Sequence, residues 1–575
     1  MCPIFMFIFK TTNIHKLLIL YVLVLFSCRI HPVDNEKYSI TKYAQSNDGM
    51  VVSAHPLASN VGVDILKMGG NAVDAAIAVQ FALAVVYPGA GNIGGGGFMV
   101  IQSQKGVSDC IDYREKAPLK ATEKMYQDSN GIVIDSLSKF GALAAGVPGS
   151  VDGMVLAFEH YSQLKDWKAL IQPAIDLANN GFPITENEAN QLNSKQSDFK
   201  NNNRFITQFE RAHWEKGDIL VQKDLAHTLE LIRDNGRDGF YSGEVAQAIV
   251  DEMQAMGGLI SLEDMNSYHA TQRTPITTQY KGYDIISMPP PSSGGICLVQ
   301  LLRTIEPYPI HEMGFHSAES VHMMVEAERR VYADRSEHLG DPDYYKVPMK
   351  TLLSSEYNAD RFKDFDRQKA TKSQDVKPGI IEHEETTHVS IIDMDGNAVS
   401  LTTTLNGGYG SCTVVKGCGF LLNNEMDDFS VKPGVPNMFG LVGAEANKIE
   451  PSKRMLSSMT PTIVMKDGKI KMIVGTPGGS TIITSVFQVV VNVIDFGMDV
   501  SQAVQSPRFH HQWLPDTIYM EPNALSEETM QKLKDIGHNF SVKNQIGRVE
   551  AIVVDSSGIR HGAADKRGDD TVVGY

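Results

Sequence analysis

The sequence contains few cysteines, and none of them has the spacing of a metal site. Of its 6 cysteines, Cys110, Cys297, Cys412 and Cys418 lie in the body of the chain, without C-x-x-C spacing. This argues against a structural zinc centre, and we expect neither a metal nor an organic cofactor. Cys412 and Cys418 flank a short segment, so a local disulfide and two buried free thiols are both open alternatives.

Positive charge is also scarce. The chain has 52 Lys and Arg against 68 Asp and Glu, which gives a formal net charge of −16. No cluster of basic and aromatic residues offsets this charge, so no nucleic-acid partner is expected. Beyond residue 45 no run is apolar enough to cross a membrane. The proportions of hydrophobic and charged residues, 42% and 21%, are those of a globular protein.

The N-terminal segment has the pattern of a secretory signal. Lys10 and Lys16 precede a short apolar run, Leu17–Phe26, and a small residue follows it. We expect residues 1–28 to be the signal and the protein to be exported to the periplasm. A small residue before Cys28 resembles a bacterial lipoprotein signal, in which Cys28 would carry a lipid anchor. A plain signal peptide is the alternative.

Residues 46–104 predict two helices and a strand. The second helix is the strongly apolar Ala72–Val86, which Asn71 can cap. A helix that is apolar nearly all round is normally buried. Gly94–Gly97 lack the Lys-Ser/Thr of a phosphate loop and lead into a strand, so we interpret them as a tight turn with close backbone packing.

The charged segment 363–385 separates two halves of different pattern. The region before it, about 150–380, is helix-rich, whereas segment 363–385 has few large apolar side chains and is interpreted as an exposed linker. After it, two hairpins and an apolar helix are predicted. Helices before and after paired hairpins favour an α/β layered sandwich (αββα) with two stacked, mainly antiparallel sheets covered by helices. The predicted elements are His388–Ile392, Ala398–Thr404, Thr462–Met465, Ile470–Val474 and the helix from Ser480 to Ile494.

The boundary between Glu385 and Thr386 has chemical interest. A threonine hydroxyl is a weak nucleophile that needs a neighbouring base. If the chain were cut before Thr386, the new α-amine would lie beside Thr386 Oγ, and its unperturbed pKa of about 8 suits a base. By itself, a threonine pair that opens a strand more often reflects β-propensity alone.

Motifs on both sides of this boundary resemble the gamma-glutamyltransferase (glutathione hydrolase) family, in order and over nearly everything from residue 46 to 575. The motifs are Asp112-Tyr113-Arg114-Glu115, Gly146-Val147-Pro148-Gly149-Ser150, Thr386-Thr387-His388-Val389-Ser390, Asp395-Gly396-Asn397-Ala398-Val399-Ser400, Thr404-Leu405-Asn406, Leu422-Asn423-Asn424-Glu425-Met426-Asp427-Asp428-Phe429, Pro451-Ser452-Lys453-Arg454-Met455-Leu456-Ser457-Ser458-Met459 and Pro477-Gly478-Gly479.

The resemblance implies an N-terminal nucleophile hydrolase that cleaves itself between Glu385 and Thr386. Residues 29–385 would become a large subunit and 386–575 a small catalytic subunit, together forming a heterodimer. Thr386 would be the nucleophile and Thr404 the hydroxyl that orients it. Gly478 and Gly479 would provide the oxyanion hole, a role for which two successive N–H groups before a helix are suited.

The resemblance also implies a pocket for a γ-glutamyl group. Arg114, Ser457 and Ser458 would bind its α-carboxylate, and Asn406, Glu425 and Asp428 would accept from its α-ammonium. The expected substrates are glutathione and related γ-glutamyl compounds, with water, amino acids or peptides receiving the γ-glutamyl group from Thr386. The segment Pro433–Ala444 would correspond to a lid, in which Phe439 stands where some members carry tyrosine.

Two rival functions remain. A cephalosporin (glutaryl) acylase would share the fold and the nucleophile, but its substrates lack the α-ammonium that Asp428 would recognise. The second rival is a catalytically inactive surface lipoprotein that uses the fold for binding.

Overall fold

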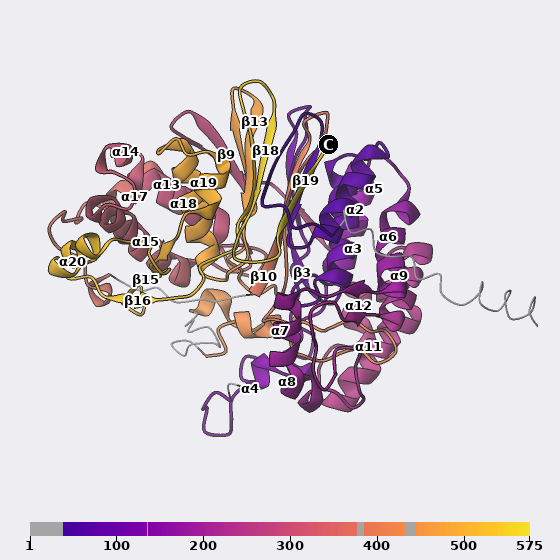
Figure 1. Ribbon diagram of the computed structural model, residues 1–575. Helices are drawn as coiled ribbons and strands as arrows, with labels where there is room; N and C mark the ends of the chain where they lie inside the picture. The colour runs from indigo at the N-terminus through magenta and orange to yellow at the C-terminus, as the bar shows by residue number, and fades with distance from the viewer. Residues whose placement is uncertain (1–37, 135, 377–384, 433–443) are drawn as a thin grey trace, which may run out of the picture. The chain divides into compact units, whose positions relative to one another are not determined.

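Two seven-stranded sheets lie face to face in the computed structural model (Figure 1), which describes residues 38–134, 136–376, 385–432 and 444–575. Neighbouring strands within both sheets are antiparallel. The first sheet has the order β1 (Tyr43–Ser46), β18 (Arg560–Ala564), β17 (Glu550–Val554), β13 (Lys469–Gly475), β12 (Thr462–Lys466), β9 (Tyr283–Ser287) and β8 (Ile276–Tyr280). The second has the order β19 (Thr571–Gly574), β2 (Met50–Ser53), β10 (Glu385–Ile392), β11 (Ala398–Asn406), β3 (Gly96–Gln102), β4 (Ser108–Asp112) and β7 (Thr271–Arg273).

Helices cover the outer face of each sheet, which confirms the predicted αββα sandwich (Figure 1). The second sheet is covered by α2 (Pro56–Lys67) and α3 (Ala72–Val86), outside which lie α5 (Ser150–Tyr161), α6 (Trp167–Asn180) and α9 (Lys223–Asn235). The first sheet is covered by α13 (Gly294–Ile305), α18 (Thr481–Ile494) and α19 (Val500–Gln505), with α15 (Ala318–His338) beyond them.

The remaining elements connect these layers. They are the helices α4 (Ser136–Lys139), α7 (Glu186–Ser194), α8 (Gln196–Asn201), α10 (Asp238–Tyr241), α11 (Gly243–Met256), α12 (Leu262–Ser267), α14 (Ile310–Met313), α16 (Met349–Leu352), α17 (Ser355–Arg361) and α20 (Glu527–Asp535), the 3₁₀ turns η1 (Ala142–Ala144), η2 (Ser373–Asp375), η3 (Glu425–Asp428) and η4 (Glu445–Asn447), and the strands β5 (Phe182–Pro183), β6 (Ile219–Leu220), β14 (Phe509–His510), β15 (Ile518–Met520) and β16 (Phe540–Val542).

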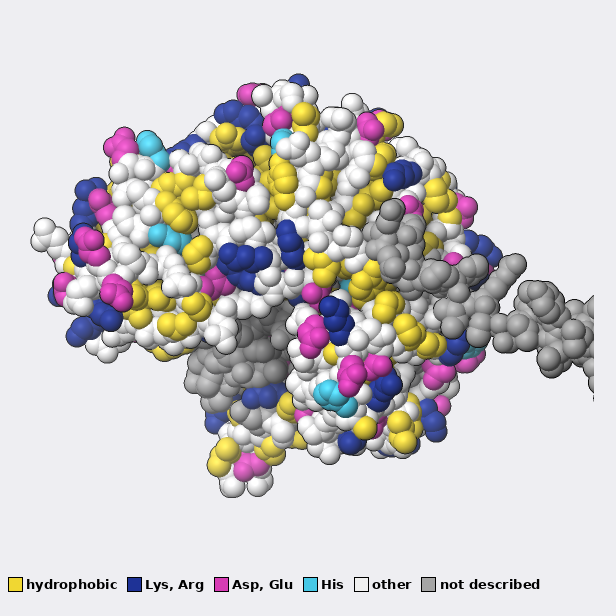
Figure 2. All heavy atoms as spheres, in the orientation of Figure 1, with side chains coloured by type: hydrophobic (Ala, Val, Ile, Leu, Met, Phe, Trp, Pro, Cys, Tyr) yellow, Lys and Arg dark blue, Asp and Glu magenta, His cyan; other side chains and the backbone are white. Residues whose placement is uncertain are grey.

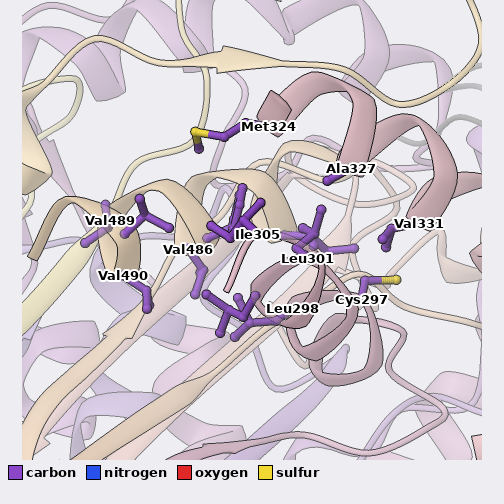
Figure 3. Packing of buried hydrophobic residues seen from close by; sticks show 14 of the residues in the cluster. Cys297, Leu298, Leu301, Ile305, Met324, Ala327, Val331, Val486, Val489 and Val490 are labelled. Carbon is purple, nitrogen blue, oxygen red and sulfur yellow. The ribbon is translucent and has the colours of Figure 1, made fainter. Parts of the chain in front are cut away.

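Apolar side chains fill the space on both sides of the first sheet. Between the two sheets, Phe98 and Val100 of β3 share one cluster with Ile473 of β13. On the outer face, Leu298 and Leu301 of α13 pack with side chains of α15 and α18 (Figure 3). Full burial of such a side chain contributes about 1.5–3 kcal/mol, so this packing fixes the sheets on which the site is built.

The predicted helix Ala72–Val86 is α3, and every one of its residues is buried. Asn71 caps it by accepting from the N–H groups of Val73 and Asp74, each at 2.9 Å. The glycine turn that follows also packs closely, as predicted. A Cβ on Gly95 would lie 2.1 Å from the Thr404 carbonyl oxygen, so only glycine lets this turn approach the end of β11.

The segment expected to be an exposed linker is instead anchored as far as Val376. Ala370, Ser373 and Val376 are buried, and the Trp513 indole donates to the carbonyls of Ser373 and Val376 at 2.7 and 3.0 Å. The charged side chains of residues 363–376 are exposed as predicted, but a few small side chains and the backbone anchor the segment. Residues 377–384 lie outside the described part of the chain.

Strands from before and after Glu385 alternate within the sheets. β2 pairs with β19 on one side and β10 on the other, and β11 pairs with β3. In the first sheet, β1 pairs with β18, and β9 pairs with β12. A cut before Thr386 would therefore leave two chains that share both sheets.

Three further expectations concern the cysteines, membrane-spanning helices and surface charge. Cys110, Cys297, Cys412 and Cys418 are buried free thiols, which is the second of the two alternatives for Cys412 and Cys418. Among the described residues, no helix combines the length and hydrophobicity needed to span a membrane. On the face in Figure 2, basic side chains are interspersed with acidic ones over the described surface.

Candidate active site

Thr386 lies near the start of β10, directly opposite Thr404 of β11. The register shifts between Glu385 and Thr386, so the predicted cleavage point coincides with an irregularity in the strand. Thr386 is 3% exposed, and its hydroxyl makes no hydrogen bond with a described residue. Thr404 Oγ1 accepts from the Asn406 N–H at 2.8 Å. The two predicted hydroxyls are therefore neighbours, without a direct hydrogen bond between them.

A buried histidine, which the sequence analysis did not single out, lies two residues after Thr386 on the same face of β10. His388 Nδ1 lies 2.8 Å from Thr402 Oγ1, and His388 Nε2 lies 3.1 Å from Ser390 Oγ. Burial lowers the pKa of His388 to about 3, so its ring is neutral near pH 7. Both ring nitrogens already contact hydroxyls on β10 and β11. We therefore interpret His388 as a structural residue between these strands rather than a base for Thr386.

The predicted oxyanion glycines follow β13. A Cβ on Gly475 would lie 2.2 Å from His388 Cε1, so β13 ends directly against the strand of Thr386. Gly478 and Gly479 have φ values of 132° and 63°, which glycine adopts without strain. The Thr481 hydroxyl donates to the Gly478 carbonyl at 2.6 Å. This bond and the positive φ values orient the two peptide units just before α18.

Arg114 lies at the centre of the predicted γ-glutamyl pocket and is fully buried. Its Nη1 lies 2.8 Å from Glu425 Oε2, and its Nη2 contacts the Asp428 carboxylate. Arg114 also donates to the carbonyls of Met455 and Leu456, at 3.3 and 3.2 Å. The structure therefore brings together the two halves of the predicted pocket, with Arg114 held between them.

Buried carboxyl groups outnumber the guanidinium in the cluster around Arg114. Glu115, for which the family motif predicted no role, lies 3.6 Å from Arg114 Nη1. Burial raises the pKa of Glu115 to about 8 and raises that of Glu425 well above its usual value, against the opposing effect of Arg114. Asn406 Oδ1 accepts from no described residue. The pocket thus has acceptors to spare for a cationic group.

The two predicted serines lie next to Leu456. Ser457 Oγ accepts from the Met459 N–H at 3.2 Å, and Ser458 Oγ accepts from Arg335 Nη2 at 2.9 Å. Arg335 also donates to Ser293 Oγ at 2.8 Å. No local sequence pattern marks Arg335, because its contact with Ser458 joins residues 123 positions apart.

Only one group of described residues combines metal-ligand types closely enough to hold an ion: His322, Glu326 and His538. His322 Nδ1 and His538 Nε2 are 2.7 Å apart. Glu326, however, is paired with Arg330 at 2.6 Å and with Arg329 at 3.3 Å. Two guanidinium groups on the only carboxylate oppose a divalent cation, so we interpret this group as structural. The predicted lid Pro433–Ala444 and Phe439 fall outside the described residues, apart from Ala444.

The fold has close structural relatives. A cephalosporin acylase from Bacillus halodurans covers 96% of this chain, and the match covers 99% of that protein, with a TM-score of 0.82 and 26% identity. The Helicobacter pylori gamma-glutamyltranspeptidase structure matches 60% of this chain and 97% of its own, with a TM-score of 0.55 and 42% identity. The shared sandwich places the protein among the N-terminal nucleophile hydrolases.

The sequence comparisons are more specific. A glutathione hydrolase proenzyme from Pseudomonas sp. (strain A14) is 49% identical, with 88% of this chain and 89% of the relative covered. The model of the family described as Gamma-glutamyltranspeptidase matches residues 58–575. The chain belongs to the gamma-glutamyltranspeptidase family.

Proposed function

We propose that the protein cleaves its own chain before Thr386 and then uses Thr386 to hydrolyse or transfer the γ-glutamyl group of glutathione and related compounds. Family membership and 49% identity to a glutathione hydrolase support this activity. The observation that carries the assignment of Thr386 is its position: a hydroxyl without a described hydrogen-bond partner, near the start of β10 and opposite Thr404.

In maturation, Thr386 Oγ attacks the carbonyl carbon of Glu385, and the peptide nitrogen leaves as the α-amine of Thr386. Water then hydrolyses the resulting ester, which frees the Glu385 carboxylate and regenerates the hydroxyl. The products are chains 29–385 and 386–575, which form a heterodimer. The alternation of β2 and β3 with β10, β11 and β19 supports a product whose two chains remain associated.

Donor recognition depends on two opposite charges of the substrate. In the proposed complex, Arg114, Ser457 and Ser458 bind the α-carboxylate, while the acceptors Asn406, Glu425 and Asp428 bind the α-ammonium. Arg114 contacts Glu425 and Asp428 directly. When a zwitterion binds between them, its carboxylate takes the place of the acidic partners of Arg114. Its ammonium takes the place of Arg114 beside Glu425 and Asp428, which limits the desolvation cost.

In turnover, Thr386 Oγ attacks the γ-carbonyl carbon, and the Thr386 α-amine takes the proton of the hydroxyl. The N–H groups of Gly478 and Gly479 stabilise the developing oxyanion, and the amine leaving group departs with a proton. Water or the amine of an amino acid or peptide then attacks the γ-glutamyl ester, which releases glutamate or a new γ-glutamyl amide. No cofactor is needed for either step.

The acylase relative makes glutaryl transfer the second candidate function. A glutaryl group has the same chain length but no α-ammonium. It would leave the carboxyl groups of Glu115, Glu425 and Asp428, all of which contact Arg114, without the substrate ammonium, so the γ-glutamyl group is the better match. We further propose that residues 1–28 direct export to the periplasm, with a lipid anchor if Cys28 is modified.

The decisive test is Thr386→Ala in the full-length chain. We expect a single band on a denaturing gel and no release of p-nitroaniline from L-γ-glutamyl-p-nitroanilide, because maturation and turnover both need the Thr386 hydroxyl. Thr386→Ser is the matched control, since it keeps a hydroxyl and should still yield two bands at a lower rate. Normal maturation and turnover by Thr386→Ala would disprove the assignment, and intact mass would locate the cut and detect a lipid.

A further inference from the structure

Asn447 lies between the two halves of the pocket. It ends η4 and is 6% exposed. Its Nδ2 donates to the backbone carbonyl of Asp428 at 2.7 Å, and its Oδ1 accepts from the Leu456 N–H at 3.0 Å. Both ends of the side-chain amide are therefore engaged, one with each half.

The two segments that Asn447 joins have no strand pairing with each other. Asp428 lies in the 3₁₀ turn η3, and Leu456 lies in an irregular stretch after Arg454. Leu456 directly precedes Ser457, and its carbonyl accepts from Arg114 Nη2 at 3.2 Å. Arg114 itself contacts Asp428. A closed ring of contacts thus runs from Arg114 through Leu456 and Asn447 to Asp428.

The bond from Arg114 to Asp428 in this ring is the one that a bound zwitterion would replace. Once the substrate separates these two side chains, Asn447 is the side chain that still joins the backbone of Asp428 to the backbone beside Ser457. Its planar amide is short and has few rotamers, so it defines this spacing well. A shift of about 1 Å in such a clamp can cost about 100-fold in rate.

We propose that Asn447 is a positioning residue that sets the distance between the ammonium and carboxylate halves of the pocket and thereby favours donors that carry both charges. This inference rests on the proposed roles of Arg114 and Asp428. In this proposal Asn447 does not touch the substrate. It acts through the backbone of the segments that carry Asp428 and Ser457, which bind the substrate.

The test compares two anilides, L-γ-glutamyl-p-nitroanilide and glutaryl-p-nitroanilide, which lacks the ammonium. For Asn447→Ala we expect kcat/KM for the γ-glutamyl anilide to fall about 30-fold, mainly through KM. The glutaryl anilide should lose less than about threefold, because it uses one half of the clamp only. Asn447→Asp keeps the acceptor for the Leu456 N–H but loses the donor to Asp428, and should be intermediate.

Asn358→Ala is the matched control. Asn358 is 2% exposed in α17 and also joins backbone groups, donating to the carbonyls of Leu352 and Ser354 at 2.9 and 2.8 Å. It should lower the melting temperature as Asn447→Ala does, without changing the ratio of the two kcat/KM values. All rates are divided by the fraction of the protein that has been cleaved. If Asn447→Ala does not mature, the ratio of the two kcat/KM values for Asn447→Asp tests the proposal.

A ratio within twofold of wild type in the maturing Asn447 variant, or an equal change in Asn358→Ala, would overturn the proposal. Failure of the underlying pocket assignment has a different signature. In that case the wild-type protein itself would turn over the glutaryl anilide as well as the γ-glutamyl anilide.

Discussion

Two buried clusters of arginine and carboxylate side chains differ in how completely their carboxylates are satisfied. In the cluster around Asp565, Oδ2 accepts from Arg508 Nη2 at 2.7 Å and the Val549 N–H at 2.9 Å. Oδ1 accepts from the backbone N–H and Nη1 of Arg567, at 3.0 and 2.8 Å. Burial alone would raise the pKa of Asp565, but Arg508 and Arg567 hold it below its usual value.

The carboxyl groups around Arg114 behave in the opposite way. Neither oxygen of Glu115 accepts a hydrogen bond from a described residue, and burial raises the pKa of both Glu115 and Glu425. The protein thus completes the first cluster with its own donors and leaves the second short of cations. Buried carboxyls with raised pKa values can mark a ligand site, and the cluster around Arg114 has this pattern whereas Asp565 does not.

The largest expected effect on catalysis is that of Asp428→Asn in the cluster around Arg114. The amide removes the negative charge opposite the substrate ammonium, so kcat/KM for L-γ-glutamyl-p-nitroanilide should fall about 1,000-fold. Turnover of glutaryl-p-nitroanilide should change little, because that donor has no ammonium. Steady-state kinetics with both anilides checks this, and equal losses for the two donors would contradict it.

The control for that variant is the same substitution in the satisfied cluster. Asp565→Asn removes the carboxylate that pairs with the buried Arg508 side chain, whereas Arg567 keeps its contact with Glu521, and the change should cost about 3–5 kcal/mol of unfolding free energy. The urea midpoint measures this loss, and the γ-glutamyl-to-glutaryl ratio should stay at the wild-type value. Asp428→Asn should keep its urea midpoint much closer to wild type.

Local patterns predicted much of the fold, and motifs predicted most of the candidate site. The helix Ala72–Val86 was predicted to the residue because its apolar run and its cap are local. The interleaving of β2 between β10 and β19 was not predicted, because strand order depends on contacts between residues far apart in sequence. Asn447 was missed for the same reason, since its partners become neighbours only in the fold.

The anchored segment before Val376 shows a further limit of composition. Many charged side chains predicted exposure, and several of them are exposed. The segment is nevertheless held through its backbone, because Asp516 accepts from the Ser373 N–H at 2.8 Å and Trp513 donates to two carbonyls. Backbone hydrogen bonds of this kind have no sequence signature.

A smaller effect concerns pH. Because burial raises its pKa to about 8, Glu115 is protonated at neutral pH, and a bound ammonium favours its ionised form. Binding should therefore release a proton, and KM for the γ-glutamyl anilide should fall about fivefold as pH rises from about 6.5 to 8. Glu115→Gln removes this titration and should flatten the profile. A wild-type KM that is constant over this range would contradict the assignment.

The smallest effect expected from the pocket is that of Glu425→Gln. A glutamine oxygen still accepts from the substrate ammonium, so KM should rise only about two- to fivefold, with kcat nearly unchanged. The same change removes a buried acid whose pKa burial raises. When the pKa of a carboxyl is higher in the folded than in the unfolded state, the folded protein becomes less stable as pH rises from the unfolded pKa toward the folded pKa. The melting temperature of Glu425→Gln should therefore exceed that of wild type more at pH 8 than at pH 5. Thermal unfolding at the two pH values measures this, and a variant less stable than wild type at pH 8 would mean that Glu425, like Asp565, is satisfied by the protein alone.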